Sequence, residues 1–237
     1  KIGACCGKKH RYGYIYNDDE PIKPKKINVN KELDAEKSFT LTMEFQKRKI
    51  QSNAFTARKF PLLVTLSVEG AGASVRAPVD LVCVIDYSGS MNGEYIKMAQ
   101  KSVERLLEQL NENDRLSIVI FDDLVERLTP LLRMTGANKT KIINSIQNIG
   151  GNGGTNIKER LQTAVNVLNS RRYFNNVAGI FLLSDGVDDR NHDPIIEIVK
   201  LNKYTVHTFG FGPEIDVQLL TKIAEIRDGN FYHIQRT

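Results

Sequence analysis

The sequence has few cysteines and no long apolar run. Of its three cysteines, Cys5 and Cys6 are adjacent and adjacent cysteines rarely pair, while Cys83 stands in an apolar run and is most simply a small buried hydrophobe. This cysteine usage favours a reducing compartment, so we expect an intracellular, cytoplasmic protein. No apolar run approaches the roughly 20 residues that cross a bilayer, so we expect no membrane span.

Several enzyme signatures are also missing. The glycine-rich stretch 150–154 has neither G-x-G-x-x-G spacing after a first strand nor the G-K-S/T ending of a phosphate loop. The sequence contains no G-x-S-x-G motif, and no Ser-His-Asp triad can be recognised in it. Three of the four histidines, His192, His207 and His233, show no spacing typical of a zinc site. We therefore expect a protein that is not an enzyme and that takes no small-molecule substrate.

The net charge of +5 is unevenly spread. Basic side chains crowd the first fifty residues: Lys8, Lys9, His10, Arg11, Lys23, Lys25, Lys26, Lys47, Arg48 and Lys49. Such an arm can bind nucleic acid, the acidic tails of microtubules or anionic lipid, or it can simply keep the chain soluble. No nucleic-acid-binding motif accompanies the charge, so we favour the solvated arm and expect no nucleic-acid partner.

The chain divides into three predicted parts. Residues 1–36 mix Gly, Pro, Lys and Asp with little periodicity and indicate an extended basic leader. Residues 37–76 contain two alternating apolar patterns, near 39–45 and 61–68, that predict strands, followed by a glycine-rich linker. Two strands alone bury too little surface to be stable, so they are expected to form a small β element outside the main sheet that needs further support.

From Val79 onwards, strand and helix patterns alternate. The run Leu81–Ile85 suits a parallel strand covered on both faces. A helical stripe follows, which comprises Ile96, Ala99, Val103, Leu106 and Leu110. The alternation then continues with further strand segments and helical stripes, and it includes a short edge strand over 125–133. Residues 77–237 therefore predict an α/β domain with a doubly wound, mostly parallel central sheet and helices on both faces.

Polar side chains directly follow the first buried strand. Asp86, Ser88 and Ser90 stand at alternate positions after Ile85, so they can turn oxygens toward one point. Hard divalent ions such as Mg²⁺ prefer oxygen ligands in octahedral geometry and often retain waters. One carboxylate and two hydroxyls would leave such an ion an open coordination position, which suits the capture of a carboxylate from outside.

This pattern resembles the metal-ion-dependent adhesion site of von Willebrand factor A domains, whose motif reads D-x-S-x-S. The family also carries a Thr ligand in a Gly-rich loop, matched here by Thr155, and an Asp after a later buried strand, matched by Asp185. The resemblance covers about residues 77–234 and implies a site for Mg²⁺ or Mn²⁺ formed by Asp86, Ser88, Ser90, Thr155 and Asp185. It also implies a protein partner that supplies a Glu or Asp to the metal.

The sequence of the segment Val206–Gly212 resembles that of intracellular plant and protist members of the family, some of which carry a RING ubiquitin-ligase module. No RING-type Cys/His array occurs in these residues. Family members usually end with a helix after the last strand, and that helix is expected to be missing here. Two acidic pairs, Asp122-Asp123 and Asp188-Asp189, are interpreted as turn or loop residues instead of ligands.

Three functional hypotheses follow. The first is a protein-interaction module that binds an acidic residue of its partner through the metal. The second is a structural subunit of a large intracellular assembly that uses the fold as a scaffold. The third is the recruiting domain of a ubiquitin ligase whose catalytic module lies elsewhere. Metal dependence of partner affinity separates the first from the second, and a RING pattern in flanking sequence would identify the third.

Overall fold

The computed structural model describes residues 7–10, 13–16, 19–22, 39–45, 62–68, 76–121, 125–147, 157–185 and 193–234. The chain forms two compact units: one consists of residues 1–23 and 77–237, the other of residues 24–76. The unit that contains the α/β domain thus also includes residues 1–23. No helix in the described part of the chain is both long and apolar enough to cross a membrane.

The α/β unit is built on a seven-stranded sheet, as counted over the described ranges, in the order β11-β10-β9-β5-β6-β7, with β8 also paired to β6. The strands are β5 (Val79–Asp86), β6 (Arg115–Phe121), β7 (Val125–Arg127), β8 (Leu132–Arg133), β9 (Val177–Ser184), β10 (Thr205–Phe211) and β11 (Phe231–Ile234). Pairing is parallel from β11 to β6, while β7 and β8 run antiparallel to β6. The predicted doubly wound, mostly parallel sheet is confirmed.

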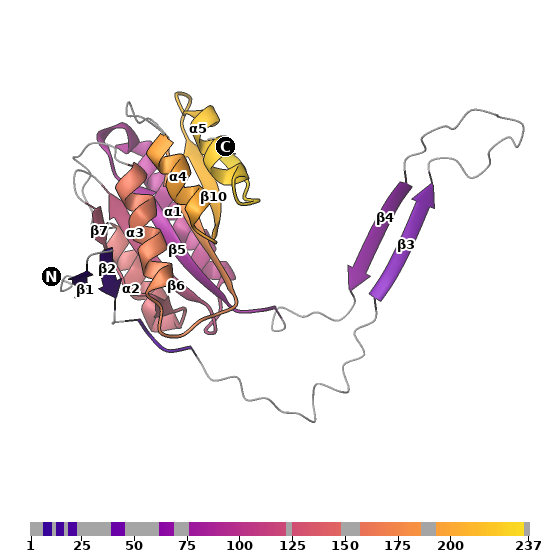
Figure 1. Ribbon diagram of the computed structural model, residues 1–237, viewed down its shortest axis with the longest axis horizontal. Coiled ribbons are helices and arrows are strands. Elements are labelled where there is room, and N and C mark those ends of the chain that lie inside the picture. The colour runs from indigo at the N-terminus through magenta and orange to yellow at the C-terminus, as the bar shows by residue number, and fades with distance from the viewer. Residues whose placement is uncertain are drawn as a thin grey trace, which may run out of the picture. The chain divides into compact units, whose positions relative to one another are not determined.

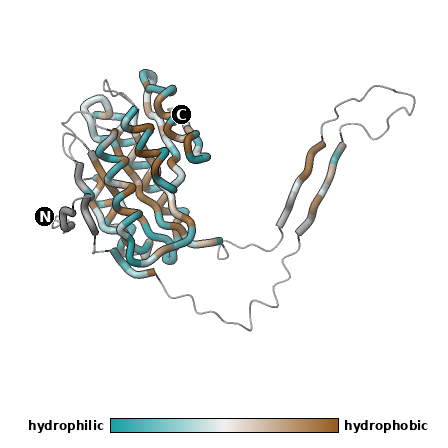
Figure 2. The backbone as a smooth tube through the Cα atoms, viewed as in Figure 1, coloured by the Kyte–Doolittle hydropathy of each residue, from teal (hydrophilic) through white to brown (hydrophobic). Residues whose placement is uncertain are grey.

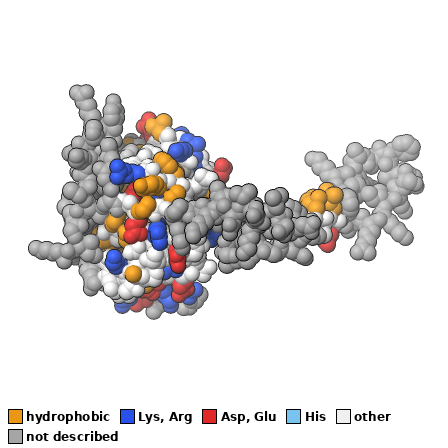
Figure 3. All heavy atoms as spheres, turned by 90° about the horizontal axis from the view of Figure 1, so that it is seen from below, with side chains coloured by type: hydrophobic (Ala, Val, Ile, Leu, Met, Phe, Trp, Pro, Cys, Tyr) orange, Lys and Arg blue, Asp and Glu red, His pale blue; other side chains and the backbone are white. Residues whose placement is uncertain are grey.

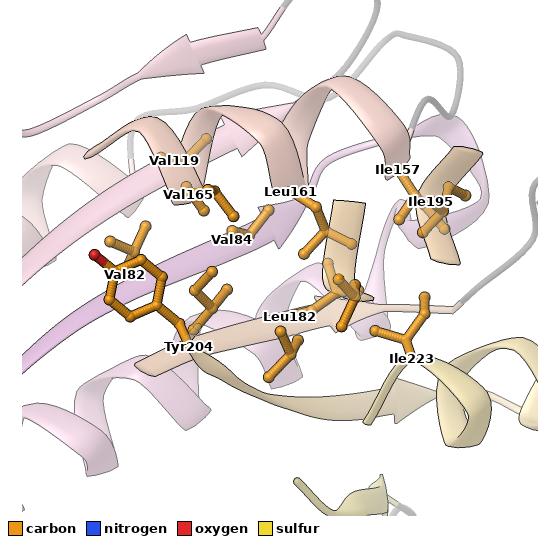
Figure 4. Close-up of a cluster of buried hydrophobic side chains, with 14 of the residues drawn as sticks. Val82, Val84, Val119, Ile157, Leu161, Val165, Leu182, Ile195, Tyr204 and Ile223 are labelled. Carbon is orange, nitrogen blue, oxygen red and sulfur yellow. The ribbon is translucent and has the colours of Figure 1, made fainter. Parts of the chain in front are cut away.

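Helices cover both faces of this sheet (Figure 1). They are α1 (Glu94–Gln109), α2 (Gly136–Gln147), α3 (Ile157–Asn169), α4 (Asp193–Leu201) and α5 (Val217–Glu225). Strand β5 contributes to both cores because its side chains alternate. Val82 and Val84 pack with α3, α4 and α5, and Figure 4 shows that cluster. Leu81, Cys83 and Ile85 pack with α1 and α2 on the other face.

Hydropathy follows this layering, because the central strands carry the long apolar stretches (Figure 2). Two sequence expectations need correction. The fully buried positions of α1 are Ala99, Val103 and Leu107, whereas Leu106 is only partly buried. The predicted single edge strand over 125–133 is two short strands, because Pro130 lacks the N–H that a continuous ladder needs.

Two small sheets lie outside the main one. Strands β1 (Gly7–His10) and β2 (Gly13–Tyr16) form an antiparallel hairpin within the predicted extended leader, and β2 contacts α3. In the second unit, β3 (Phe39–Phe45) pairs antiparallel with β4 (Leu62–Val68), which confirms the predicted small β element. Several large apolar side chains of this hairpin are exposed: Leu41, Met43, Leu62, Leu63 and Val64. Figure 3 shows hydrophobic side chains gathered on this hairpin.

Candidate metal centre

Asp86 is the last residue of β5, the central strand of the α/β unit. Its side chain is fully buried, and both carboxylate oxygens accept hydrogen bonds. Oδ1 accepts from the backbone N–H of Ser88 at 2.9 Å, and Oδ2 accepts from the Ser184 hydroxyl at 2.5 Å. The carboxylate is therefore held in one orientation at the carboxyl edge of the sheet.

The loop after Asp86 brings two hydroxyls together. Ser88 is buried and Ser90 is exposed, and their Oγ atoms lie 3.1 Å apart. A short 3-10 turn, Gly89–Met91, fixes this geometry because the N–H of Met91 donates to the carbonyl of Ser88 at 3.0 Å. The Met91 side chain is fully buried and anchors the turn in the core. The predicted D-x-S-x-S oxygens thus gather on one side of the strand end.

Asp185 follows directly after β9, the parallel neighbour of β5. It is buried, and its carbonyl accepts from the backbone N–H of Asp216 at 3.1 Å. Asp216 in turn caps helix α5 by accepting from the N–H of Leu219 at 2.8 Å. The backbone of Asp185 is therefore fixed by a strand end and by the start of a helix together.

The ionisation of Asp86 depends on its surroundings. The pKa of Asp86 is raised from 3.8 to about 6, chiefly because burial disfavours the charged carboxylate. Hydrogen bonds from Ser184 and Ser88 lower it in part, and the nearby negative charge of Asp185 adds a small increase. No ion pair joins Asp86 to a basic side chain within the described ranges. A buried carboxylate beside a second one favours either a proton or a bound cation.

The donor set fits a hard divalent cation. Two carboxylates and two neighbouring hydroxyls offer only oxygen, which is the ligand type that Mg²⁺ and Mn²⁺ prefer. Over the described part of the chain no group of three or more His, Cys, Asp or Glu side chains gathers. Any ion held here would rely on hydroxyls and waters beside the carboxylates.

Several predicted residues lie outside the described ranges. Thr155, the fifth predicted ligand, is one of them, and both acidic pairs, 122–123 and 188–189, are others, as is His192. The other two histidines are apart from the site. His207 packs edge-on against Phe181 with ring centroids 5.6 Å apart, and His233 Nε2 lies 3.2 Å from the Gly212 carbonyl oxygen.

Sequence reasoning missed Ser184. It is the last residue of β9, one position before Asp185, and it completes the hydrogen bonding of Asp86 from the neighbouring strand. A signal was present in the sequence, since a polar residue ends an otherwise apolar run. Its partner was not readable, because the two residues lie 98 positions apart.

The sheet order explains why these segments converge. The chain runs from β5 to β6 on one side and later returns to β9 on the other, so the strand order reverses between β5 and β9. Ligand sites of open α/β sheets lie beyond the carboxyl ends of the strands at such a reversal. The fold and the site thus define an α/β module of the doubly wound class with an oxygen-lined site at its switch point.

The model of the von Willebrand factor type A domain family matches residues 80–237, and the chain belongs to this family. One relative, the E3 ubiquitin-protein ligase WAV3 of Arabidopsis thaliana, is 41% identical over 114 residues, which is 48% of this chain and 15% of that protein. The chain therefore spans only a small part of that relative's length.

Solved structures show the same fold. The von Willebrand factor type A protein from Catenulispora acidiphila matches with a TM-score of 0.62 and 21% identity, over 74% of this chain and 41% of that one. The manganese-loaded TRAP protein of Plasmodium vivax matches with a TM-score of 0.55 and 18% identity, over 67% of this chain and 69% of that one. At these identities the likeness establishes the fold alone.

Proposed function

We propose that the chain is a non-enzymatic protein-interaction module whose binding depends on a divalent cation. The observation that carries this proposal is the pair Asp86 and Asp185, two buried carboxylates at neighbouring strand ends with the Ser88 and Ser90 hydroxyls beside them. Protein interaction is the common role of von Willebrand factor A domains. Mg²⁺ or Mn²⁺ is the proposed ion, and TRAP was solved loaded with manganese in this fold.

In this proposal the chain's own residues hold and orient the metal ion. Asp86 and Asp185 supply negative charge, directly or through water, and Ser88, Ser90 and Thr155 supply neutral oxygens. A bound divalent ion would supply Lewis-acid attraction for one carboxylate of a partner. With only two formal negative charges the shell does not repel that carboxylate, so a Glu or Asp of the partner gains a hard-ion bond.

The test measures partner capture with and without metal. Binding should fall in chelator, recover in Mg²⁺, and be lost when a single acidic residue of the partner is neutralised. Ionic strength is kept constant so that screening of the basic N-terminal residues does not imitate the effect. Glu225→Gln, which neutralises an exposed carboxylate at the end of α5, is the matched control and should leave capture unchanged. Equal affinity in Mg²⁺ and chelator would instead favour the scaffold hypothesis.

A second candidate is the recruiting domain of a ubiquitin ligase in the cytoplasm. The observation that favours it is the 41% identity to WAV3 over 114 residues. An intracellular setting agrees with the scarcity of cysteine pairs. Under this candidate the chain still contributes binding, while catalysis would come from a RING module outside residues 1–237. Determining the flanking sequence decides it: a RING Cys/His pattern supports recruitment to ubiquitylation, and its absence from the full-length protein contradicts it.

A further inference from the structure

A second polar site occurs at the opposite end of the sheet from Asp86. There a short N-terminal segment, residues 19–22, lies against the segment 127–133 and the start of α2. Arg115, the first residue of β6, also reaches this segment. We name the receiving side the acid-binding groove, formed by Arg115, Arg127, Leu131, Arg133 and Asn138.

Asp19 is held by one guanidinium and one backbone amide. Its Oδ1 accepts from Arg127 Nη2 at 2.5 Å and from the N–H of Leu131 at 3.0 Å. The side chains of Asp19 and Arg127 are only 1% and 2% exposed. Removing one partner of an ion pair this well buried strongly destabilises the folded protein, because the other charge then remains unpaired in a low dielectric.

Glu20 is bound along both its side chain and its backbone. Its Oε2 accepts from the N–H of Arg133 at 2.8 Å, and both carboxylate oxygens accept from Asn138 Nδ2, at 3.2 and 3.1 Å. Its N–H donates to the carbonyl of Leu131 at 3.1 Å, and its carbonyl accepts from Arg115 Nη1 at 2.7 Å. Main-chain pairing combined with side-chain recognition is how proteins bind short extended peptides.

The groove also has room beside its resident segment. A cavity of about 340 Å³ is lined by Glu20, Pro21, Arg133, Thr135 and Asn138. Within this groove Asp19 Oδ2 and Arg133 Nε are buried without a hydrogen-bond partner. The contacts therefore define a charged, peptide-sized site in which one groove atom, Arg133 Nε, and one resident atom, Asp19 Oδ2, lack a partner among the described residues.

We propose that the acid-binding groove is a binding site for a short acidic peptide, with the chain's own Asp19-Glu20 pair as its resident ligand. The donors are arranged for two successive carboxylates on an extended backbone, so an Asp-Glu segment supplied from outside takes the same place when the resident pair is neutralised. The groove lies at the amino ends of β5 and β6, whereas Asp86 ends β5, so peptide binding is independent of the metal centre.

The direct test uses the full chain and a labelled peptide with the sequence of residues 17–23, followed by fluorescence anisotropy. The double variant Asp19→Asn/Glu20→Gln should bind this peptide, because the neutral resident segment competes poorly. Wild type should bind it at least about tenfold more weakly, and a peptide with Asn and Gln at the two acidic positions should bind the variant at least about tenfold more weakly. The control variant Glu108→Gln, an exposed carboxylate on α1, should behave like wild type.

Thermal unfolding and hydrogen exchange give a second readout. The double variant should melt roughly 6 °C or more below wild type and the Glu108→Gln control. Amide exchange at Leu131 and Arg133 should quicken in the variant and slow again when the acidic peptide is added. If the double variant does not fold, Glu20→Gln alone serves for the same measurements.

Two results would overturn the proposal. Unchanged melting and exchange in the variants would show that the acid pair is not bound in solution. A destabilised variant that binds the acidic and the neutral peptide equally, or neither of them, would show a structural clasp and not a peptide-binding site. Metal affinity should be the same in wild type and Glu20→Gln, which keeps this test separate from that of the metal centre.

Discussion

The Ser184 hydroxyl donates a 2.5 Å hydrogen bond to Oδ2 of Asp86, although the two residues lie 98 positions apart in the sequence. The bond joins the ends of two adjacent parallel strands, so it can form only when β5 and β9 pair in register. It holds the one carboxylate of the first loop in place and leaves Ser88 and Ser90 to face the same point. The orientation of the central acidic ligand is thus a consequence of sheet assembly.

Asp86→Ala should abolish Mg²⁺ and Mn²⁺ binding while leaving the fold largely intact, because Asp86 supplies the only carboxylate of the first loop. Ser184→Ala is the matched comparison: it removes the orienting hydrogen bond but no proposed ligand. Its metal affinity should fall roughly 10–100-fold, as when a residue that orients a metal ligand is lost. Calorimetric titration measures both, and an unchanged affinity in Asp86→Ala would refute the assignment.

Stability of the metal-free chain should depend on pH through Asp86. Because its pKa is raised from 3.8 to about 6 in the folded state, the folded chain binds more protons than the unfolded chain between these values. Its contribution to stability is therefore greatest below pH 4 and is lost as the pH rises through 6, at a cost on the order of 3 kcal/mol at neutral pH.

In chelator at pH 7, Asp86→Asn should consequently melt above wild type, and the difference should shrink toward pH 4. Saturating Mg²⁺ should reverse the order, because only wild type gains from the ion. Thermal unfolding over this pH range checks both statements. A wild-type chain that is as stable as the Asn variant in chelator at pH 7 would contradict the prediction.

Asp80→Asn should destabilise the domain by about 3–5 kcal/mol, because it leaves two buried guanidinium groups without their counter-ion. The Asp80 carboxylate is fully buried and accepts from Arg115 Nε and Nη2, both at 2.8 Å, from Arg171 Nη1 at 2.5 Å, and from Asn175. Urea unfolding measures the loss. The control Glu197→Gln, at an exposed site on α4, should keep the free energy of unfolding within about 0.5 kcal/mol of wild type. An equal loss in both variants would contradict the explanation by unpaired guanidinium groups.

Gly229→Ala should be strongly destabilising, by roughly 3 kcal/mol or more, since the added Cβ would stand 1.9 Å from the backbone carbonyl oxygen of Val206. Neither the added Cβ nor the Val206 carbonyl oxygen is the end of a flexible side chain, so the backbone would have to move. Gly136→Ala is the control, because a Cβ there meets nothing within 4 Å. Equilibrium unfolding should show little change or a small gain for the control, and similar losses in both variants would show that the steric argument is wrong.

Much of the fold was readable from the sequence because apolar runs and helical stripes alternate after residue 79. Leu81–Ile85 predicts a strand covered on both faces, and parallel strands place their following residues at one edge. That rule brings Asp86 and Asp185 to the same edge of the sheet, and the structure places them there on neighbouring strands. The role of Thr155 as a ligand remains a prediction, since it lies outside the described residues.

Long-range polar contacts were not readable. Asp19 and Glu20 stand within a stretch whose excess of lysine and arginine predicts a solvated leader, yet both acids are bound by residues more than 100 positions later. Nothing in the local pattern distinguishes Arg127 and Arg133 from exposed basic residues, because their burial depends on which segment covers them. Ser184 was missed for the same reason.

The distance in sequence between the acid pair and its groove has a consequence for synthesis of the chain. Asn138 is made 118 residues after Glu20, which at 5–20 residues per second corresponds to a delay of roughly 6–24 s. During that interval the segment with Asp19 and Glu20 emerges with its two carboxylates uncovered and open to chaperones or to other basic surfaces. This acidic segment is therefore accessible to other molecules during synthesis, before the groove that binds it has been made.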